Sequence, residues 1–266
     1  MSKASLENEQ TVKYHFYNTP CILIAVAGGT ASGKTTFCTQ VSKTLEGEKF
    51  VVVSQDSFYR PLTKEEHDNV AEYNFDSPDA FDWQLIVDTL KNIKAKKPVS
   101  LPIYDYVTHS RKPEWVPVEV GDVVMFEGLY TFFQMKGFEE YVKLFDLKIF
   151  IESDDDTRLG RRILRDMKFR GRTLDSILFQ YKKFVKPAYE EWVYPQRIRA
   201  DVIVPWCEID QKKKTNFCEM PALKMVSQYI RMFFTHIPFQ KVLSKGNIEI
   251  SADLDCYKAS LSDQEK

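Results

Sequence analysis

Several features that mark secreted, membrane-bound or zinc-binding proteins are absent from the sequence. The five cysteines are scattered and odd in number, and no CxxC pair occurs, which favours a reduced, intracellular protein without disulfides or structural zinc. Residues 1–19 carry acidic and polar side chains instead of the apolar core of a secretory signal. No apolar run approaches the roughly 20 residues that cross a bilayer. We therefore expect a cytoplasmic protein with no membrane partner.

Net charge is also nearly absent. Lys and Arg number 37 against 38 for Asp and Glu, so the chain has no overall basic field, and we expect no nucleic-acid partner. With 266 residues, 44% of them hydrophobic and 28% charged, the composition is that of a globular protein, long enough for one large α/β domain.

Apolar segments of strand length recur along the chain. They lie at 21–27, 50–55, 122–128, 147–153 and 200–205. Patterns typical of helices lie at about 33–45, 82–96, 135–145, 155–168 and 221–234. Strands that alternate with helices predict an α/β fold, with a parallel sheet covered by helices on both faces. The first segment, "CILIAVA", is almost continuously apolar, as expected for a central strand.

One stretch interrupts this alternation. Residues 98–119 have short alternating apolar segments, three internal prolines and no helical period, which predicts an inserted β-hairpin-like excursion. We expect a flexible segment over 1–20, one folded domain over 21–236 and a polar tail over 237–266.

A glycine-rich motif follows the first strand. "GGTASGKT" at 28–35 matches G-x-x-x-x-G-K-[ST], the P-loop in which backbone amides and a helix N-terminus bind phosphate oxygens. Lys34 supplies a charge for the β- and γ-phosphates, and the Thr35 hydroxyl supplies a ligand for Mg²⁺. A glycine-rich turn without a ligand is the alternative, but the position between a strand and a helix favours phosphate. The predicted fold is therefore of the P-loop NTPase type, and the predicted nucleotide-binding residues are Gly28, Gly29, Thr30, Ala31, Ser32, Gly33, Lys34, Thr35 and Thr36.

No guanine-reading Asn-Lys-x-Asp motif is present, which argues against a GTPase. The apolar strand 123–126 ends in Glu127. This carboxylate can hold Mg²⁺ directly or through water, or it can simply be satisfied by a neighbouring loop.

Arginines gather after the fourth strand segment. Four of them fall at i, i+3, i+4 and i+7 of one predicted helix, and two more follow across Gly171: Arg158, Arg161, Arg162, Arg165, Arg170 and Arg172. Such a concentration of like charge predicts an arginine-rich helical lid, over about 155–186, that neutralises transferring phosphoryl oxygens. The alternative is a solvated face paired with acids such as Asp154 or Asp166.

The second strand segment ends in "SQDSFYR" at 54–60. Ligands bind beyond the carboxyl ends of the strands of a parallel sheet, so Asp56 should face the γ-phosphate from the acceptor side. That is the place of a general base toward an attacking hydroxyl, although a role in the Mg²⁺ shell stays open. Aromatic residues in "YNFDSPDAFD" and "YDYVTH" suit a flat heterocycle, with core packing as the alternative.

Together these segments resemble the uridine–cytidine kinase family, within the phosphoribulokinase and uridine kinase group. The matching motifs are "GGTASGKTT", "SQDSFYR", "NFDSPDAFD", "PIYDYVTHSRK", "VVMFEG", "DTRLGRRILRD", "RGRTLDSILFQYKKFVKPAYE" and "ADVIVP", in family order from about 21 to 205. The resemblance implies a P-loop kinase domain that uses ATP and Mg²⁺ to phosphorylate the 5′-hydroxyl of uridine and cytidine, giving UMP and CMP in pyrimidine salvage. It also implies a homotetramer and feedback binding of CTP or UTP.

The resemblance also assigns roles to positions of this chain. Asp56 matches the catalytic base near Mg²⁺, and Thr35 and Glu127 match positions linked to the metal. Arg165 and Arg170 match lid positions on the phosphate side, and we expect them, together with Lys34 of the P-loop and Asp56, to be the catalytic residues. Asp76 matches the acid that binds the ribose hydroxyls, and Tyr104 and His109 match contacts to the pyrimidine. The remaining positions on the substrate side are Tyr59, Phe75, Tyr106, Arg162, Arg172 and Gln180.

The chain departs from the family after "ADVIVP", where Arg-Gly is usual and Trp206-Cys207 stands here. Asp210 is the expected acid on the nucleotide side of this segment, and a preference for ATP over GTP stays open. The alternatives to a uridine–cytidine kinase are a P-loop kinase for another small hydroxyl, such as ribulose phosphate or pantothenate, and a non-catalytic nucleotide-binding regulator.

Overall fold

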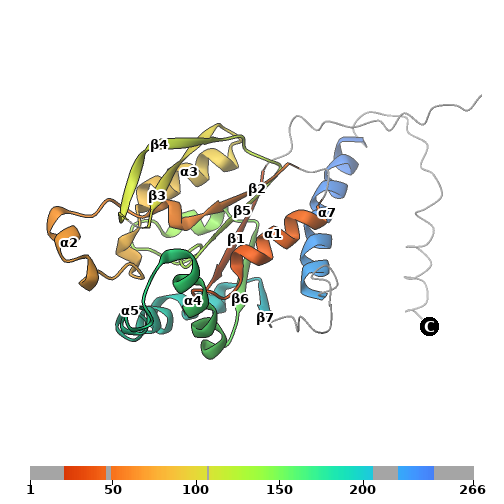
Figure 1. Ribbon diagram of the computed structural model, residues 1–266. Coiled ribbons are helices and arrows are strands. Elements are labelled where there is room, and N and C mark those ends of the chain that lie inside the picture. Colours follow the sequence, from red (N-terminus) through yellow and green to blue (C-terminus); the bar gives the residue numbers. More distant parts are fainter. Residues whose placement is uncertain (1–20, 46–48, 107, 206–220, 243–266) are drawn as a thin grey trace, which may run out of the picture. The chain divides into compact units, whose positions relative to one another are not determined.

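The computed structural model describes residues 21–45, 49–106, 108–205 and 221–242, and its centre is a five-stranded sheet (Figure 1). The strand order is β2-β5-β1-β6-β7, and every neighbouring pair is parallel. The strands are β1 Ile22–Gly28, β2 Phe50–Ser54, β5 Val123–Gly128, β6 Leu147–Glu152 and β7 Val202–Pro205. All five strands predicted from the sequence are therefore confirmed.

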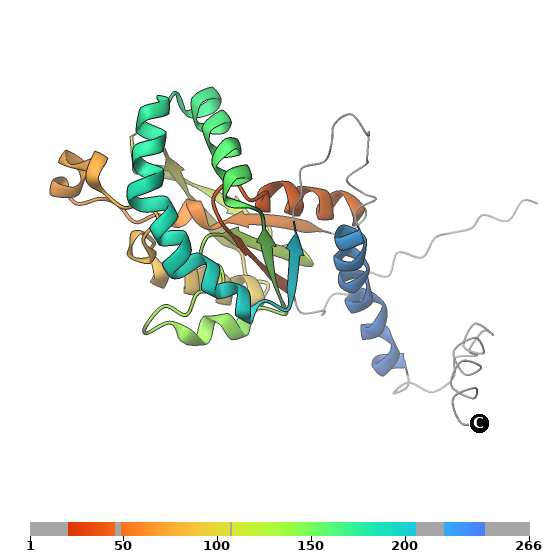
Figure 2. The same ribbon diagram turned by 90° about the horizontal axis from the view of Figure 1, so that it is seen from below.

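The inner strands are buried because helices cover both faces of the sheet. Every residue of β1 and of β5 is buried. Helix α3, Trp83–Lys94, packs its apolar side into a core cluster with alternate residues of β1, such as Leu23 and Ala25. Helix α1, Lys34–Thr44, lies on the other side of the sheet (Figure 2). This arrangement explains the nearly continuous apolar sequence of the central strands.

A second, two-stranded sheet stands apart from the first. Strand β3, Val99–Asp105, pairs antiparallel with β4, Ser110–Val118, which confirms the hairpin predicted at 98–119. The inner end of β3 is anchored in the core by Val99, whereas β4 is exposed along most of its length.

Two helical arms form a hairpin above the end of the sheet (Figure 2). The first is α4, Asp155–Arg170, which ends at Gly171 with a left-handed φ of 62°. The second arm is continuously helical and runs through α5 Leu174–Gln180, η5 Tyr181–Val185, α6 Lys186–Ala188, η6 Tyr189–Val193 and η7 Tyr194–Arg199. Its stretches η5 and η6 are π-helical and flank Pro187, which has no N–H to continue an α-helical ladder.

The prediction of a helix over 135–145 was wrong. Gly137 has a left-handed φ of 86°, and only the 3₁₀ helix η4, Glu139–Leu144, forms in this region. Further short helices, absent from the sequence-based prediction, are η1 Gln55–Phe58, α2 Lys64–Asp68, η2 Val70–Glu72 and η3 Pro78–Ala80. They connect β2 to α3 and carry several of the side chains described below.

The predicted helix at 221–234 is confirmed as α7, Pro221–Val242. Its first two turns bury Leu223 and Val226, and Ser227 Oγ lies 2.5 Å from Thr44 Oγ1 of α1. One compact unit of the chain extends to Ser227 and contains every site described below. Within the described ranges, no helix is both long and apolar enough to span a bilayer.

Candidate active site

The turn between β1 and α1 has the backbone that the glycine-rich motif predicts. A Cβ on Gly28 would lie 2.6 Å from the carbonyl oxygen of Ile151 on β6, so only glycine fits there. Gly33 has a φ of 102°, which glycine adopts without strain. The turn therefore brings its backbone amides to the carboxyl end of the sheet, directly before the first turn of α1.

Two side chains of α1 point into the same site. Lys34 Nζ donates to the carbonyl oxygens of Gly28 and Gly29, at 3.0 and 2.9 Å. Burial lowers the pKa of Lys34, although the nearby carboxylates of Glu127 and Asp56 oppose that effect. The Thr35 hydroxyl donates to Glu127 Oε1 at 3.1 Å, and burial raises the pKa of Glu127. A lysine, a hydroxyl and a carboxylate thus converge at the floor of the site.

These oxygen ligands fit Mg²⁺. Mg²⁺ in nucleotide enzymes is held by one or two carboxylates together with substrate phosphates and water, rather than by a complete protein cage. The described part of the chain holds no cluster of three His, Cys, Asp or Glu side chains that could hold a metal ion. The bonded pair of Thr35 and buried Glu127, with Asp56 as a neighbouring charge, is the donor set expected of such a site.

Asp56 lies on η1, directly after the edge strand β2. Ser54 caps η1 by accepting a hydrogen bond from the backbone N–H of Asp56, and the Tyr106 hydroxyl donates to Asp56 Oδ2 at 3.1 Å. Buried Gln55 holds the turn from behind, because its Oε1 accepts from the backbone N–H of Tyr130 at 2.8 Å. The negative charge of Asp56 contributes to raising the pKa of Glu127 and that of Asp76, which shows that the three carboxylates lie near one another.

Aromatic side chains form the wall opposite the P-loop. Tyr59 follows η1 and contacts Tyr104 of the hairpin, with ring centroids 5.0 Å apart. Phe75 stacks on His109 at the hairpin turn, with centroids 4.8 Å apart and an interplanar angle of 25°. His109 has a left-handed φ of 51°, an uncommon conformation for a residue with a side chain. Burial and the charge of Arg172 lower the pKa of His109, which favours the neutral imidazole.

Asp76 is a half-buried acid beside this aromatic wall. Burial raises its pKa, and the charge of Arg162 partly opposes the increase. Arg162 also donates to Thr30 Oγ1 of the P-loop at 3.1 Å. The arginine helix is thereby linked to both the phosphate side and the acceptor side of the site.

The arginines of α4 are organised by one fully buried carboxylate, Asp166. Its contacts to Arg165 Nε, Arg170 Nη1 and Arg162 Nε measure 2.8, 3.5 and 3.6 Å. Burial alone would raise the pKa of Asp166, but the hydrogen bond from Arg165 and the surrounding positive charge hold it below its usual value. Arg172 reaches the second helical arm, where it donates to Gln180 Oε1 at 2.5 Å.

The expectation that the whole arginine row faces the phosphates was wrong for Arg158. This side chain is 1% exposed, and its guanidinium lies 3.6 Å from the ring centroid of Tyr189. It also forms an ion pair with Asp155 and donates to the carbonyl oxygen of Ser153. A Cβ on Gly29 would meet Arg158, so this arginine packs behind the P-loop.

A single cavity of about 570 Å³ joins the P-loop, Asp56, the aromatic wall and the arginine helix. The residues predicted from the sequence that line it are Thr30, Ala31, Gly33, Lys34, Thr35, Thr36, Asp56, Tyr59, Phe75, Asp76, Tyr104, Tyr106, His109, Glu127, Arg162, Arg165, Arg170, Arg172 and Gln180. The predicted residues Gly28, Gly29 and Ser32 belong to the turn but do not line the cavity. Asp210 lies outside the described residues.

Three lining residues were given no role by the sequence-based prediction of the site: Tyr73, Leu129 and Phe184. A fourth, Arg161, belongs to the predicted arginine row but was given no role of its own. Tyr73 is the first residue of the motif that contains Phe75, and their rings lie 4.7 Å apart. Phe184 lies within the predicted lid, in the π-helical part of the second arm.

The chain is similar to known proteins in sequence and in fold. Residues 23–211 match the model of the phosphoribulokinase / uridine kinase family. The chain is 47% identical over 183 residues to uridine-cytidine kinase B of Dictyostelium discoideum, which covers 69% of this chain and 74% of that protein. It is 45% identical over 212 residues to uridine-cytidine kinase 2-B of Danio rerio, with 76% and 77% covered.

Among solved structures, the phosphoribulokinase from Rhodobacter spheroides superposes with a TM-score of 0.53 at 16% sequence identity. The superposition covers 69% of each chain. At this identity the likeness shows the fold alone, which is an α/β fold of the P-loop NTPase type.

Proposed function

The chain belongs to the phosphoribulokinase and uridine kinase family and is a kinase, and from this membership we propose that it transfers the γ-phosphoryl group of ATP to the 5′-hydroxyl of uridine and cytidine. The products are UMP and CMP. The two relatives named above are uridine–cytidine kinases at 45% and 47% identity over most of both chains, and they favour this activity over phosphorylation of ribulose phosphate or pantothenate.

The continuity of the cavity is the observation that carries the proposal. One space of about 570 Å³ runs from the P-loop, past Asp56, to a pocket of Tyr, Phe and His side chains with a half-buried acid, Asp76. A nucleoside needs this combination, because its base is flat and weakly polar while its ribose presents neighbouring hydroxyls. In this proposal Asp76, which lines the cavity, accepts hydrogen bonds from those hydroxyls, and the stacked pair of Phe75 and His109 contacts the base.

Asp56 performs the acid–base part of the proposed reaction. It accepts the proton of the 5′-hydroxyl as the hydroxyl oxygen bonds to the γ-phosphorus and the bond from phosphorus to the bridging oxygen of ADP breaks. Lys34 and the P-loop amides hold the phosphate oxygens, and Arg165 and Arg170 supply positive charge where negative charge accumulates. Mg²⁺, held by Thr35 and Glu127 with Asp56 nearby, supplies further charge neutralisation when it is bound.

Selection of both pyrimidines is explained by a neutral His109. An imidazole can present either ring nitrogen as donor or acceptor, so it can meet the carbonyl oxygen of uracil or the amino group of cytosine at one place. The lowered pKa of His109 keeps that choice open at neutral pH. Purines are excluded by their size.

Further parts of the proposal follow from the family. Kinases with a P-loop use nucleoside triphosphates with Mg²⁺, and we propose ATP as the donor, with GTP as the alternative. We further propose that the enzyme serves pyrimidine salvage in the cytoplasm, assembles into homotetramers and is inhibited by CTP and UTP. Mass measurement in solution and inhibition assays with both triphosphates test the last two points.

A coupled assay of ADP release decides the substrate. The acceptors are uridine, cytidine, adenosine, thymidine and ribulose 5-phosphate, each supplied with ATP and, in a parallel series, with GTP and detection of GDP. Turnover of uridine and cytidine, with little or none of the other three, is expected. Activity only on a non-nucleoside would overturn the proposed substrate while leaving the kinase assignment intact.

A further inference from the structure

The β3–β4 hairpin carries Tyr104, Tyr106 and His109, yet it forms a sheet of its own. Among the residues that the structure describes, no backbone ladder connects it to the five-stranded sheet, and an isolated two-stranded hairpin is marginally stable in water. Its position relative to Asp56 must therefore be held by side chains. The rings of Tyr59 and Tyr104, with centroids 5.0 Å apart, supply one such contact.

One hydrogen bond, from the Tyr106 hydroxyl to Asp56 Oδ2, links the hairpin to Asp56 directly, and Arg111 supplies a second, multiple link. All nine residues of β4 are exposed except Arg111 and the terminal Val118. The side chain of Arg111 is only 15% exposed, and it points into the body of the protein. It therefore stands out on a strand that otherwise faces solvent.

The guanidinium of Arg111 makes three contacts with two separate elements. Its Nε donates to the carbonyl oxygen of Tyr59 at 2.7 Å, and its Nη2 donates to that of Phe58 at 3.2 Å. Its Nη1 contacts Asp82 Oδ2 at 3.1 Å, while Asp82 Oδ1 caps the N-terminus of α3. Phe58 and Tyr59 are the second and third residues after Asp56. The planar guanidinium of Arg111 therefore joins the hairpin to the turn that carries Asp56.

We propose that Arg111 is a positioning residue that holds the hairpin and the Asp56 turn as one unit. It thereby sets the distance between His109, which recognises the pyrimidine, and Asp56, which accepts the proton. This role rests on the proposed function, in which His109 meets the pyrimidine and Asp56 the 5′-hydroxyl. Arg111 does not line the cavity, so it acts on the substrate through these neighbours. Only arginine offers a planar set of donors that can reach two carbonyl oxygens and a carboxylate at once.

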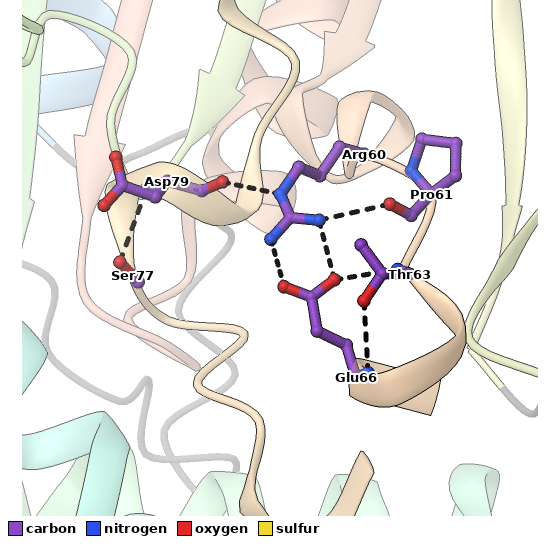
Figure 3. A network of polar contacts seen from close by, with 6 residues as sticks. All are labelled: Arg60, Pro61, Thr63, Glu66, Ser77 and Asp79. Atoms are coloured by element: carbon purple, nitrogen blue, oxygen red, sulfur yellow. Dashed lines mark hydrogen bonds and ion pairs between the residues drawn. The ribbon is translucent and has the colours of Figure 1, made fainter. Parts of the chain in front are cut away.

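The test compares Arg111→Lys with a matched control, Arg60→Lys. Arg60 also donates to two backbone carbonyl oxygens, of Asp79 and Pro61, and pairs with a carboxylate, Glu66 (Figure 3). Its contacts join α2 to η3, its guanidinium lies 5.6 Å from the ring centroid of Tyr73, and none of these contacts reaches the hairpin. Lysine keeps the charge in both variants but cannot span the three acceptors.

Steady-state kinetics give the first readout. Because misplacement of reacting groups by about 1 Å can cost on the order of 10²-fold in rate, we expect Arg111→Lys to lower kcat/KM for uridine and cytidine on the order of 10²-fold. The KM for ATP should stay at the wild-type value, and Arg60→Lys should keep wild-type kinetics for all substrates. Asp82→Asn, which leaves both carbonyl contacts in place, should show a smaller loss in the same direction. Wild-type kcat/KM for uridine in Arg111→Lys, or equal losses for ATP and nucleoside, would overturn the proposal.

Hydrogen exchange gives a second readout that needs no substrate. In Arg111→Lys, backbone amides of residues 99–105 and 110–118 should exchange faster than in the wild type, while β1 and β5 should be unchanged. Arg60→Lys should not alter exchange in the hairpin. If the wild-type enzyme accepts neither uridine nor cytidine, the proposed function is wrong, and this measurement still decides whether Arg111 holds the hairpin. Unchanged exchange there would refute the role.

Discussion

Replacement of Asp56 by Asn should separate proton transfer from binding. The two side chains have nearly the same size, and the amide oxygen can still accept the hydrogen bond that the Tyr106 hydroxyl donates to Oδ2 at 3.1 Å. The amide cannot take up the proton of the acceptor hydroxyl. Because a positioned general base contributes about 10²–10⁴-fold in rate, kcat should fall by that range. The KM values for ATP and uridine should change little, since the P-loop and the aromatic wall are untouched.

The same substitution should leave the fold intact. Asp56 adds to the raised pKa values of Glu127 and Asp76, which means that its negative charge opposes ionisation of both neighbours. Removing this charge relieves repulsion among three nearby carboxylates, so Tm should stay equal to or exceed that of the wild type. A kinetic loss without a loss of Tm would exclude unfolding as its cause.

The assay is coupled ADP release with uridine at saturating ATP, accompanied by thermal unfolding. Asp68→Asn serves as the control, because Asp68 is an exposed carboxylate on α2 outside the cavity. A titration with Mg²⁺ distinguishes the two roles that the sequence left open. If Asp56 acts as the base, excess Mg²⁺ should not restore kcat; if it acts mainly through Mg²⁺, excess metal should restore most of the rate. A variant with kcat within about tenfold of the wild type at ordinary Mg²⁺ concentration would refute the base assignment.

Two further sites lend themselves to direct tests. His109→Ala removes the stack on Phe75 and the proposed hydrogen bond to the pyrimidine. It should raise the KM for uridine on the order of tenfold to a hundredfold while the KM for ATP stays constant; equal increases in both would indicate general damage to the loop. Because burial and Arg172 lower the pKa of His109, the imidazole stays neutral above the ordinary value of 6.5, so the KM for uridine should be flat above pH 6.5 and rise only at lower pH. An increase that begins above pH 6.5 would contradict this protonation state. Glu127→Gln should raise the Mg²⁺ concentration that gives half-maximal rate. It should not lower Tm, because burial already disfavours the charged form of Glu127. An unchanged Mg²⁺ dependence would exclude Glu127 from the metal site.

Local patterns were sufficient for much of the fold. The five strands, α1, α3, α4, α7 and the hairpin all lie where apolar periodicity and proline spacing predict them. The predicted helix over 135–145 failed because periodicity cannot register that the chain turns at Gly137. The predicted lid over about 155–186 includes the first part of the second helical arm, but no helical period was recognised there or beyond it, because the π-helical stretches around Pro187 do not follow a period of 3.6 residues.

The chemistry of the phosphate side was also readable from residue order. The glycines, the lysine and the threonine of a P-loop all lie in one short stretch, so a local sequence motif is sufficient to identify the phosphate-binding site. Prediction of Asp56 and Glu127 required one more rule, that the carboxyl ends of parallel strands meet at one edge of the sheet. The register that places Ser54 opposite Glu127 is the structural form of that rule.

Long-range contacts were decided only by the tertiary structure. Sequence spacing gave Arg158 and Arg162 the same face of one helix, but the packing of Tyr189 and Asp155 buried the first and left the second at the cavity. Spacing likewise could not indicate that Asp166 gathers three arginines, or that Arg111 reaches Phe58 and Tyr59, more than fifty residues earlier in the chain. The amino-acid order determined which chemical groups the enzyme contains, because short motifs carry them. The burial of charged side chains, and the partner with which each of them pairs, depended on how distant segments pack.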